Sequence, residues 1–283
     1  MKFVIIGPGV MPIPPKNWGG CEIACHYYRK NLEALGHEVE IVNTRIPDQI
    51  VAITNAINPD AVHIHYDDHV IVADHLNCKN VIITSHYGYL EQPSRWSPGY
   101  KDIFWSFVNS RVNIFCLSEG IKEIYKKAGI DESRLFVVPN NIECDLFRFN
   151  NECKYPDRSL YLAKIDIRKR QHLYQDIKSL YFAGGGNYKE FNSSNPRWLG
   201  PWSKQKLYEE LTDYANLVLL SDGEAHPGVC LEAMASGLGL VLSECATANL
   251  DLNKKFIDVI PESEIENIDY VKNVIEKNRN ISI

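Results

Sequence analysis

Short runs of apolar, often β-branched residues alternate along this chain with segments of helical periodicity, and no other feature constrains the fold as much. The run at residues 2–6 comes first. A helical pattern follows it, with one apolar face formed by Ala24, Tyr28, Leu32 and Leu35. Several runs are apolar on both faces, as parallel strands are when helices cover both sides of their sheet. The alternation therefore predicts an α/β fold built on parallel sheets.

This alternation starts twice, with a polar stretch at residues 151–158 between the two series. The first series of expected strands covers residues 2–6, 38–43, 61–65, 80–84, 113–117 and 135–139. The second covers residues 159–163, 180–183, 217–220, 240–243 and 256–260, with expected helices at 204–214, 229–236 and 262–278. Two successive series predict two doubly wound, Rossmann-like domains facing across a cleft, where the carboxyl ends of the strands bind ligands.

We place these domains at residues 1–152 and 153–262. A C-terminal helix at residues 263–283 then closes the chain and could pack back on the first domain.

Charge and composition exclude several classes of protein. Thirty basic and thirty-six acidic residues give a net charge of −6, which argues against a nucleic-acid partner. No uncharged apolar stretch approaches the roughly 18 residues of a membrane span. The first apolar run is also shorter than the core of about 7–15 residues in a signal peptide. The eight cysteines are scattered and form no CxxC pair, which favours reduced thiols and a cytoplasmic location.

Residues 219–237 contain the most informative pattern: a strand end, a loop with Glu224, and a helix that carries Glu232. Pro227 is well placed for a first helical turn. The N–H groups at the start of this helix could bind a diphosphate. They belong to Gly228, Val229, Cys230 and Leu231. Glu232 could then accept hydrogen bonds from a ribose and Glu224 from a second polyhydroxyl group, unless both glutamates are only helix-dipole and solvated-loop residues.

Glu224 and Glu232, with seven residues between them and Ala-Met-Ala-Ser-Gly after them, resemble the signature of the retaining GT-B glycosyltransferases of family 4, the glycosyl transferases group 1. Other segments resemble this family in the same order. Residues 18–22 resemble its G-G-x-E loop, 60–65 its D-V-V-H-x-H, 84–86 its T-x-H, 138–143 its V-I-P-N-G-V-D and 161–170 its V-G-R-L-x-x-x-K-G. The resemblance covers roughly residues 3–245.

The resemblance implies a compact enzyme that transfers a hexose from a nucleotide-diphosphate sugar to a glycan, lipid or small-molecule acceptor, with retention of configuration. It implies no metal and no other cofactor. The implied catalytic residues are His86 beside the sugar, Lys164 and Lys169 at the departing diphosphate, and Glu224 at the sugar hydroxyls. The implied donor-binding residues are Gly19 and Gly20 over the phosphates, Gly228–Leu231 at the diphosphate, and Glu232 at the ribose.

Two departures from the family pattern keep alternatives open. Ala163-Lys164 replaces the usual G-R, and Arg170 replaces a glycine. A nucleotide-sugar-binding protein with little catalysis is one alternative. Independently of these departures, the cluster at residues 63–69 nearly resembles the H-x-H-x-D-H motif of zinc hydrolases, with its last histidine one position late, and it leaves a zinc hydrolase as the other alternative. The aromatic residues at 96–105 could line an acceptor groove or contact a membrane surface, but their spacing suits helix packing equally well.

Overall fold

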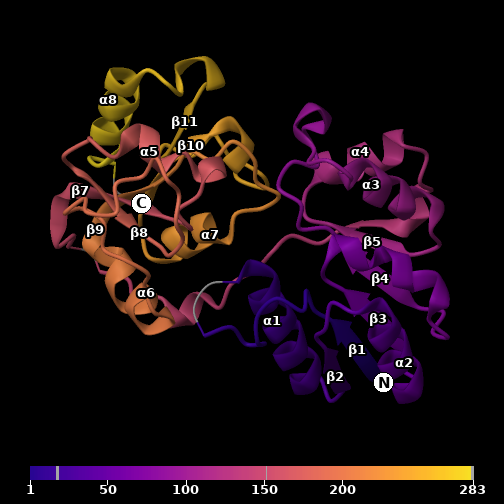
Figure 1. The fold of residues 1–283 in the computed structure, drawn as a ribbon. Coiled ribbons are helices and arrows are strands. Elements are labelled where there is room, and N and C mark those ends of the chain that lie inside the picture. The colour runs from indigo at the N-terminus through magenta and orange to yellow at the C-terminus, as the bar shows by residue number, and fades with distance from the viewer. Residues whose placement is uncertain (17–18, 151, 282–283) are drawn as a thin grey trace. The chain divides into compact units, whose positions relative to one another are not determined.

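The computed structural model describes residues 1–16, 19–150 and 152–281, and it divides the chain into two compact units (Figure 1). The first is Met1–Asn140 and the second Asn141–Ile283. The division lies upstream of the predicted one at residue 152, because the connecting segment is bonded to the second unit. Arg148 N–H donates to the Tyr208 carbonyl at 2.9 Å, and Asn150 N–H donates to Thr212 Oγ1 at 3.0 Å.

The first unit is a six-stranded parallel sheet in the order β2-β1-β3-β4-β5-β6. Its strands are β1 (Lys2–Ile6), β2 (Glu38–Val42), β3 (Ala61–Ile64), β4 (Val81–Thr84), β5 (Asn113–Cys116) and β6 (Leu135–Val137). All six lie where the alternation of the sequence predicts them. The chain reverses its direction of growth between β1 and β3, so the carboxyl ends of these two strands form the switch point where doubly wound sheets bind ligands.

Within the described residues, four helices connect these strands: α1 (Gly20–Ala34), α2 (Pro47–Ile57), α3 (Tyr100–Asn109) and α4 (Glu119–Lys127). Figure 1 shows α1 and α2 on opposite sides of β1 and β2. Ser118 caps α4 by accepting a hydrogen bond from Ile121 N–H at 3.1 Å, as a serine at this position predicts. The core of this unit is apolar and includes the fully buried residues Val4, Ile5, Ile6, Ile50 and Ile64.

The second unit repeats the same arrangement with five parallel strands in the order β11-β10-β9-β7-β8. The strands are β7 (Tyr155–Leu162), β8 (Leu180–Ala183), β9 (Tyr214–Leu219), β10 (Gly239–Ser243) and β11 (Ile257–Ile260). Its helices are α5 (Gln171–Tyr174), α6 (Lys204–Glu210), α7 (Gly228–Ala235) and α8 (Ile268–Asn278). The switch point here lies between β7 and β9.

Three elements of this unit differ from the prediction. β7 begins at Tyr155, inside the polar stretch, because Arg158 lies over the rings of Tyr155 and Tyr181. The register of β7 against β9 shifts between Tyr155 and Ser159. The helix expected at 204–214 ends at Glu210, since β9 already begins at Tyr214. The last helix begins only at Ile268, where the Asn267 side chain caps it.

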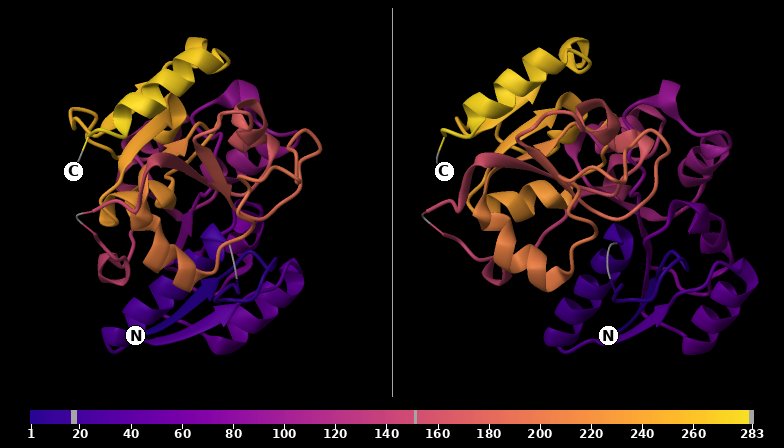
Figure 2. Two further views of the ribbon diagram at one scale, coloured as in Figure 1. Left: turned by 90° about the vertical axis from the view of Figure 1, so that its left-hand side faces the viewer. Right: turned by 60° about the vertical axis from the view of Figure 1, so that its left-hand side comes forward.

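Helix α8 packs on β9, β10 and β11, and both views of Figure 2 show it along the strands of its own unit. Asn278, which is fully buried, attaches it there by donating to Asp258 Oδ2 at 2.9 Å, and Asn216 adds a bond by donating to Asn278 Oδ1 at 3.0 Å. The packing of this helix on the first domain stays a prediction. No helix in the described parts of the chain is long and apolar enough to cross a membrane. All eight cysteines are free.

Candidate functional site

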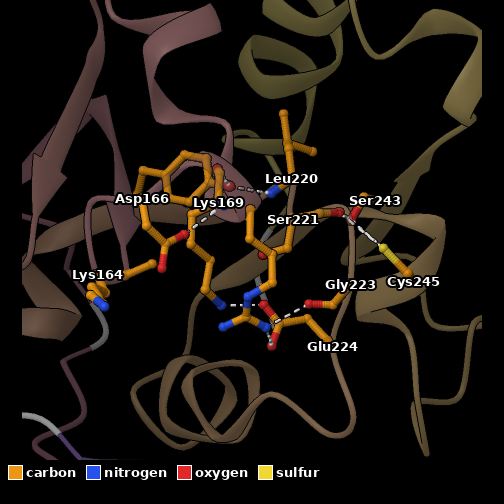
Figure 3. Close-up of polar contacts among 12 residues, drawn as sticks. Lys164, Asp166, Lys169, Leu220, Ser221, Gly223, Glu224, Ser243 and Cys245 are labelled. Atoms are coloured by element: carbon orange, nitrogen blue, oxygen red, sulfur yellow. Dashed lines mark hydrogen bonds and ion pairs between the residues drawn. The ribbon is translucent and has the colours of Figure 1, made fainter. Parts of the chain in front are cut away.

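The switch point of the second sheet brings together the two segments that the motifs single out. Lys164 and Lys169 follow β7, and Glu224 follows β9. These strands are neighbours in the sheet and run in parallel, so their carboxyl ends meet at one edge. Figure 3 shows the side chains at this edge.

Glu224 is held by two cations from the segment after β7. Its Oε1 forms a short ion pair with Lys169 Nζ, and its Oε2 lies 3.6 Å from the Arg168 guanidinium. Arg168 also donates to the Gly223 carbonyl at 2.7 Å. Only 9% of the Glu224 side chain and 11% of the Lys169 side chain are exposed. Burial alone would raise the pKa of Glu224, but Lys169 and Arg168 outweigh it and lower the pKa. Glu224 is therefore a buried, paired carboxylate, and the expectation of a solvated loop residue does not hold.

One tyrosine joins the two loops of this cluster. The Tyr161 hydroxyl, at the end of β7, donates to the Lys169 carbonyl and accepts a hydrogen bond from Leu220 N–H at 2.8 Å. Tyr161 is fully buried. The backbone positions of Lys169 and of the loop that leads to Glu224 are therefore fixed by the same atom.

Helix α7 begins directly after the Glu224 loop, and no side chain of the described residues caps its first turn. Gly228, Val229 and Leu231 are partly exposed, whereas Cys230 is buried. An uncapped first turn leaves backbone N–H groups that can bind an anion.

Glu232 lies one turn further along α7, with 13% of its side chain exposed and Oε1 at 3.9 Å from Lys204 Nζ. Burial raises the pKa of this carboxyl and Lys204 partly opposes the rise. Glu232 therefore lies in a less charged environment than Glu224.

Lys164 belongs to the same edge but not to the cluster around Glu224. Its side chain is exposed and lies apart from the Lys169–Glu224 pair in Figure 3. Its backbone is fixed on both sides, because Gln171 donates to the Lys164 carbonyl at 2.8 Å and Ile165 N–H donates to the Gly185 carbonyl at 2.8 Å. The ammonium group is thus a positive charge on a rigid segment that faces solvent.

The remaining predicted catalytic residue, His86, lies in the first unit, just after β4. Its Nε2 is 3.2 Å from His65 Nδ1, and its backbone N–H donates to Asp67 Oδ1 at 3.3 Å. Burial lowers the pKa of His86 to about 4, so the ring is neutral at pH 7.

Gly19 and Gly20 lie at the start of α1 in the same unit. A Cβ at position 19 would come within 2.6 Å of Glu22 Oε2, whereas a Cβ at position 20 would meet nothing within 4 Å. Trp18 of the same motif lies outside the described residues.

The histidines at residues 63–69 do not form a metal site. His63 Nε2 is bonded to Thr84 Oγ1 at 2.8 Å, and the His69 ring packs against Tyr66. Among the residues that the structure describes, no group of three or more His, Cys, Asp or Glu side chains could hold a metal ion. The zinc-hydrolase alternative therefore lacks a ligand set in this part of the chain.

Comparisons with known proteins agree with the motifs. Residues 45–146 match the family model described as Glycosyltransferase Family 4. No curated protein sequence matches the chain significantly. Among solved structures, HepE of Anabaena in complex with UDP-glucose is similar at 12% identity and a TM-score of 0.72, over 99% of this chain and 91% of that one.

Two further structures are similar over nearly the whole chain. Sucrose-phosphate synthase from Thermosynechococcus elongatus is 12% identical with a TM-score of 0.75, covering 99% of this chain and 92% of that one. AviGT4, a glycosyltransferase of avilamycin A biosynthesis, is 15% identical with a TM-score of 0.71, covering 100% and 89%. The chain has the GT-B fold. The family match over residues 45–146 and the GT-B fold of the similar structures confirm the predicted resemblance.

In this GT-B chain, sequence reasoning missed the ionic partners of the second unit. Arg168 had no predicted role, yet it contacts both Gly223 and Glu224. Arg170, in place of the glycine, takes up a left-handed conformation with φ 53° and pairs with Glu262. Each of these partners is more than 50 positions away in the sequence, so no local spacing could have revealed the pairs.

Proposed function

We propose that this chain is a retaining glycosyltransferase that transfers a hexose from a nucleotide-diphosphate sugar to a glycan, lipid or small-molecule acceptor. UDP is the nucleotide that we expect, because the similar HepE structures contain UDP, UDP with glucose, or UDP-glucose. The observation that carries the proposal is the cluster at the switch point of the second sheet. Two buried or half-buried cations, Lys169 and Arg168, converge there on Glu224 beside an uncapped helix start.

The roles follow from the charge of each group. Lys164 and the first N–H groups of α7 bind the diphosphate of the donor, which carries negative charge that grows as it leaves. Lys169, whose charge is shared with Glu224, holds that carboxylate in place and contributes positive potential to the same edge. Glu224 accepts hydrogen bonds from the sugar hydroxyls, and Glu232 accepts them from the ribose. For the first unit, the proposed roles are a sugar contact for His86 and a phosphate contact for the Gly19–Gly20 segment.

The reaction breaks the bond between the anomeric carbon and the diphosphate oxygen, and it forms a bond from the acceptor oxygen to the same carbon. The acceptor proton goes to the departing diphosphate, so no protein nucleophile and no redox partner is required. The chain contributes orientation and the stabilisation of charge, which together can account for most of an enzyme's rate enhancement. We propose that the reaction needs no metal and that it takes place in the cytoplasm.

A thermal-shift screen with UDP-, GDP-, ADP- and CDP-sugars tests the proposal first, and the donor that stabilises the protein most is then used for transfer assays. The product linkage, read by NMR, shows whether configuration is retained. Lys169→Met should lower the transfer rate. Its control is Lys206→Met, because Lys206 is a half-exposed lysine of the same unit paired with Glu210 at 3.6 Å. Binding without transfer to any acceptor would favour the alternative of a catalytically weak binding protein.

Chelation tests the proposed metal independence. Activity should survive an excess of EDTA, since lysines and backbone N–H groups supply the positive charge. Loss of activity that manganese or zinc restores would contradict this part of the proposal.

A further inference from the structure

Parallel strands β3 and β4 carry a histidine pair to the switch-point edge of the first unit. His65 follows β3 and His86 follows β4, and these strands are neighbours in the sheet. His65 is fully buried, and its Nδ1 lies 3.2 Å from His86 Nε2. This contact is a hydrogen bond between two rings, so one of these two nitrogens carries the proton and the other accepts it.

Both rings are neutral near pH 7, because burial lowers the pKa of His65 far below its ordinary value and that of His86 to about 4. The nitrogen that carries the proton between the two rings therefore decides the tautomer of each ring, and so whether its other nitrogen is a donor or an acceptor. A histidine that is fixed through one nitrogen has its other nitrogen set as donor or acceptor.

The second nitrogen of His65 decides the direction of this bond. His65 Nε2 is buried and has no hydrogen-bond partner among the described residues. If His86 donated to His65, then His65 Nε2 would carry a buried N–H with no acceptor. If His65 donates instead, Nε2 is a bare acceptor, and buried acceptors without a partner are tolerated better than buried N–H groups.

We infer that His65 is a positioning residue that donates its Nδ1–H to His86 Nε2 and thereby fixes the proton of His86 on Nδ1. His86 then meets a ligand with an N–H donor rather than with a basic nitrogen. Resting on the proposed function, this assigns His86 as a hydrogen-bond donor to a sugar oxygen of the donor substrate and not as a base for the acceptor.

The surroundings of the pair hold the ring of His65 and the backbone of His86. The His65 ring packs between Tyr28 of α1, with ring centroids 5.0 Å apart, and His63, with centroids 4.0 Å apart. The backbone of His86 is held by Asp67, which also accepts 2.6 Å hydrogen bonds from Ser85 Oγ and the Tyr100 hydroxyl. The His65 ring cannot turn without losing these ring contacts, and the His86 ring cannot turn without losing its bond to His65.

The ring ¹⁵N chemical shifts of histidine in the full-length protein without ligand test the inference directly. We expect the Nδ1–H form at His86 in the wild type, although the Nε2–H form predominates in free histidine. His65→Leu should return His86 to the Nε2–H form. His65→Asn should keep the wild-type form, because the asparagine amide can donate from the position of Nδ1. His63→Asn is the matched control, since His63 is also buried but bonds to Thr84 instead of His86.

Binding supplies a second readout that a merely structural role would not move. His65→Leu should weaken UDP-glucose by roughly 2–10-fold, the effect of one hydrogen bond, and leave UDP unchanged. His65→Asn should restore UDP-glucose binding. An Nε2–H form at His86 in the wild type, or equal losses for UDP-glucose and UDP, would overturn the inference. If the wild type binds neither ligand, the proposed function fails, while the ¹⁵N shifts still decide which ring donates.

Discussion

The two units share one strand order, but the edges at their switch points use different chemistry. In the second unit, the segments after β7 and β9 meet through charge, as Lys169 and Arg168 converge on Glu224. In the first unit, the segments after β3 and β4 meet through neutral rings, as His65 bonds to His86. The same topology thus supports either an ionic or a neutral edge, and the side chains alone decide which ligand atoms each can bind. The charged edge offers cations and a carboxylate, whereas the neutral edge offers hydrogen bonds alone.

Breaking the ionic edge should give the largest effect. Lys169→Met should lower the transfer rate roughly 10–1000-fold, as the loss of one electrostatic stabiliser often does. It should also destabilise the fold by about 3 kcal/mol, because it leaves Glu224 buried with only Arg168 nearby.

Lys164→Ala should lower the rate in the same range with little loss of stability, since Lys164 is exposed. Transfer rates and denaturant unfolding of both variants provide the measurement.

The double variant Lys169→Met/Glu224→Gln separates stability from activity. It removes both charges of the pair, so it should recover most of the stability without recovering the rate. Recovery of the rate as well would show that Lys169 has no role at the diphosphate.

The two glutamates should respond differently, with losses of roughly 10–150-fold in binding, the equivalent of one hydrogen bond to a charged group. Glu232→Gln should weaken both UDP-glucose and UDP, because the ribose is common to both. Glu224→Gln should weaken UDP-glucose more than UDP, because its partner is the sugar. Calorimetric titration of each ligand checks this. Equal weakening of the two ligands in Glu224→Gln would show that the sugar-holding role is wrong.

Mild acid should lower the stability of the first unit, which carries the neutral edge, before it affects the ionic edge of the second. Burial lowers the pKa of His63 to about 3, from an ordinary value of 6.5. The unfolded chain therefore takes up a proton that the folded chain refuses, and His63 alone removes about 2 kcal/mol of stability between pH 7 and pH 5. His65 and His69 act in the same direction, and Asp67, whose pKa burial raises, acts against them.

Glu224 behaves differently in the same pH range. Its pKa is lowered from 4.5, so its contribution to stability is complete above that pH and is lost only as the pH falls below it. Hydrogen exchange by mass spectrometry at pH 7 and pH 5, corrected for intrinsic rates, should show a larger increase in peptides of the first unit than in those of the second, where burial lowers the pKa of His172 and His226 only. The His63→Asn variant should reduce this difference.

The smallest effect should come from Arg170, which has a left-handed backbone where the family has glycine. Arg170→Gly relieves about 1 kcal/mol of backbone strain but loses the pair with Glu262, which is half-exposed and contributes a similar amount. The two effects should nearly cancel. Arg170→Ala keeps the strain and loses the pair, so it should be less stable than Arg170→Gly by about 1 kcal/mol in urea unfolding. Equal stability of the two variants would contradict the strain at this position.

Local patterns predicted the strands of both units, because strand burial depends on neighbours in the sequence. Capping is equally local, since Ser118 and Ser203 each accept a hydrogen bond from an N–H three residues further on. The positions of Lys164, Lys169 and Glu224 at one sheet edge followed from the order of parallel strands. The Lys169–Glu224 pair and the His65–His86 bond could not be predicted, since they depend on side chains brought together by the tertiary fold. The start of β7 inside a polar stretch could not be predicted for a similar reason, because Arg158 lies over the ring of Tyr181 in the neighbouring β8 as well as over Tyr155 of its own strand.

Tyr161, which joins the two loops of the second unit, affects how these loops respond to heating. Since the Tyr161 hydroxyl holds the Lys169 carbonyl and Leu220 N–H at once, thermal motion in either loop is passed to the other. The two loops should then loosen together over a narrow temperature range, rather than one after the other. An enzyme built in this way would stop working abruptly on warming, while most of its secondary structure is still intact.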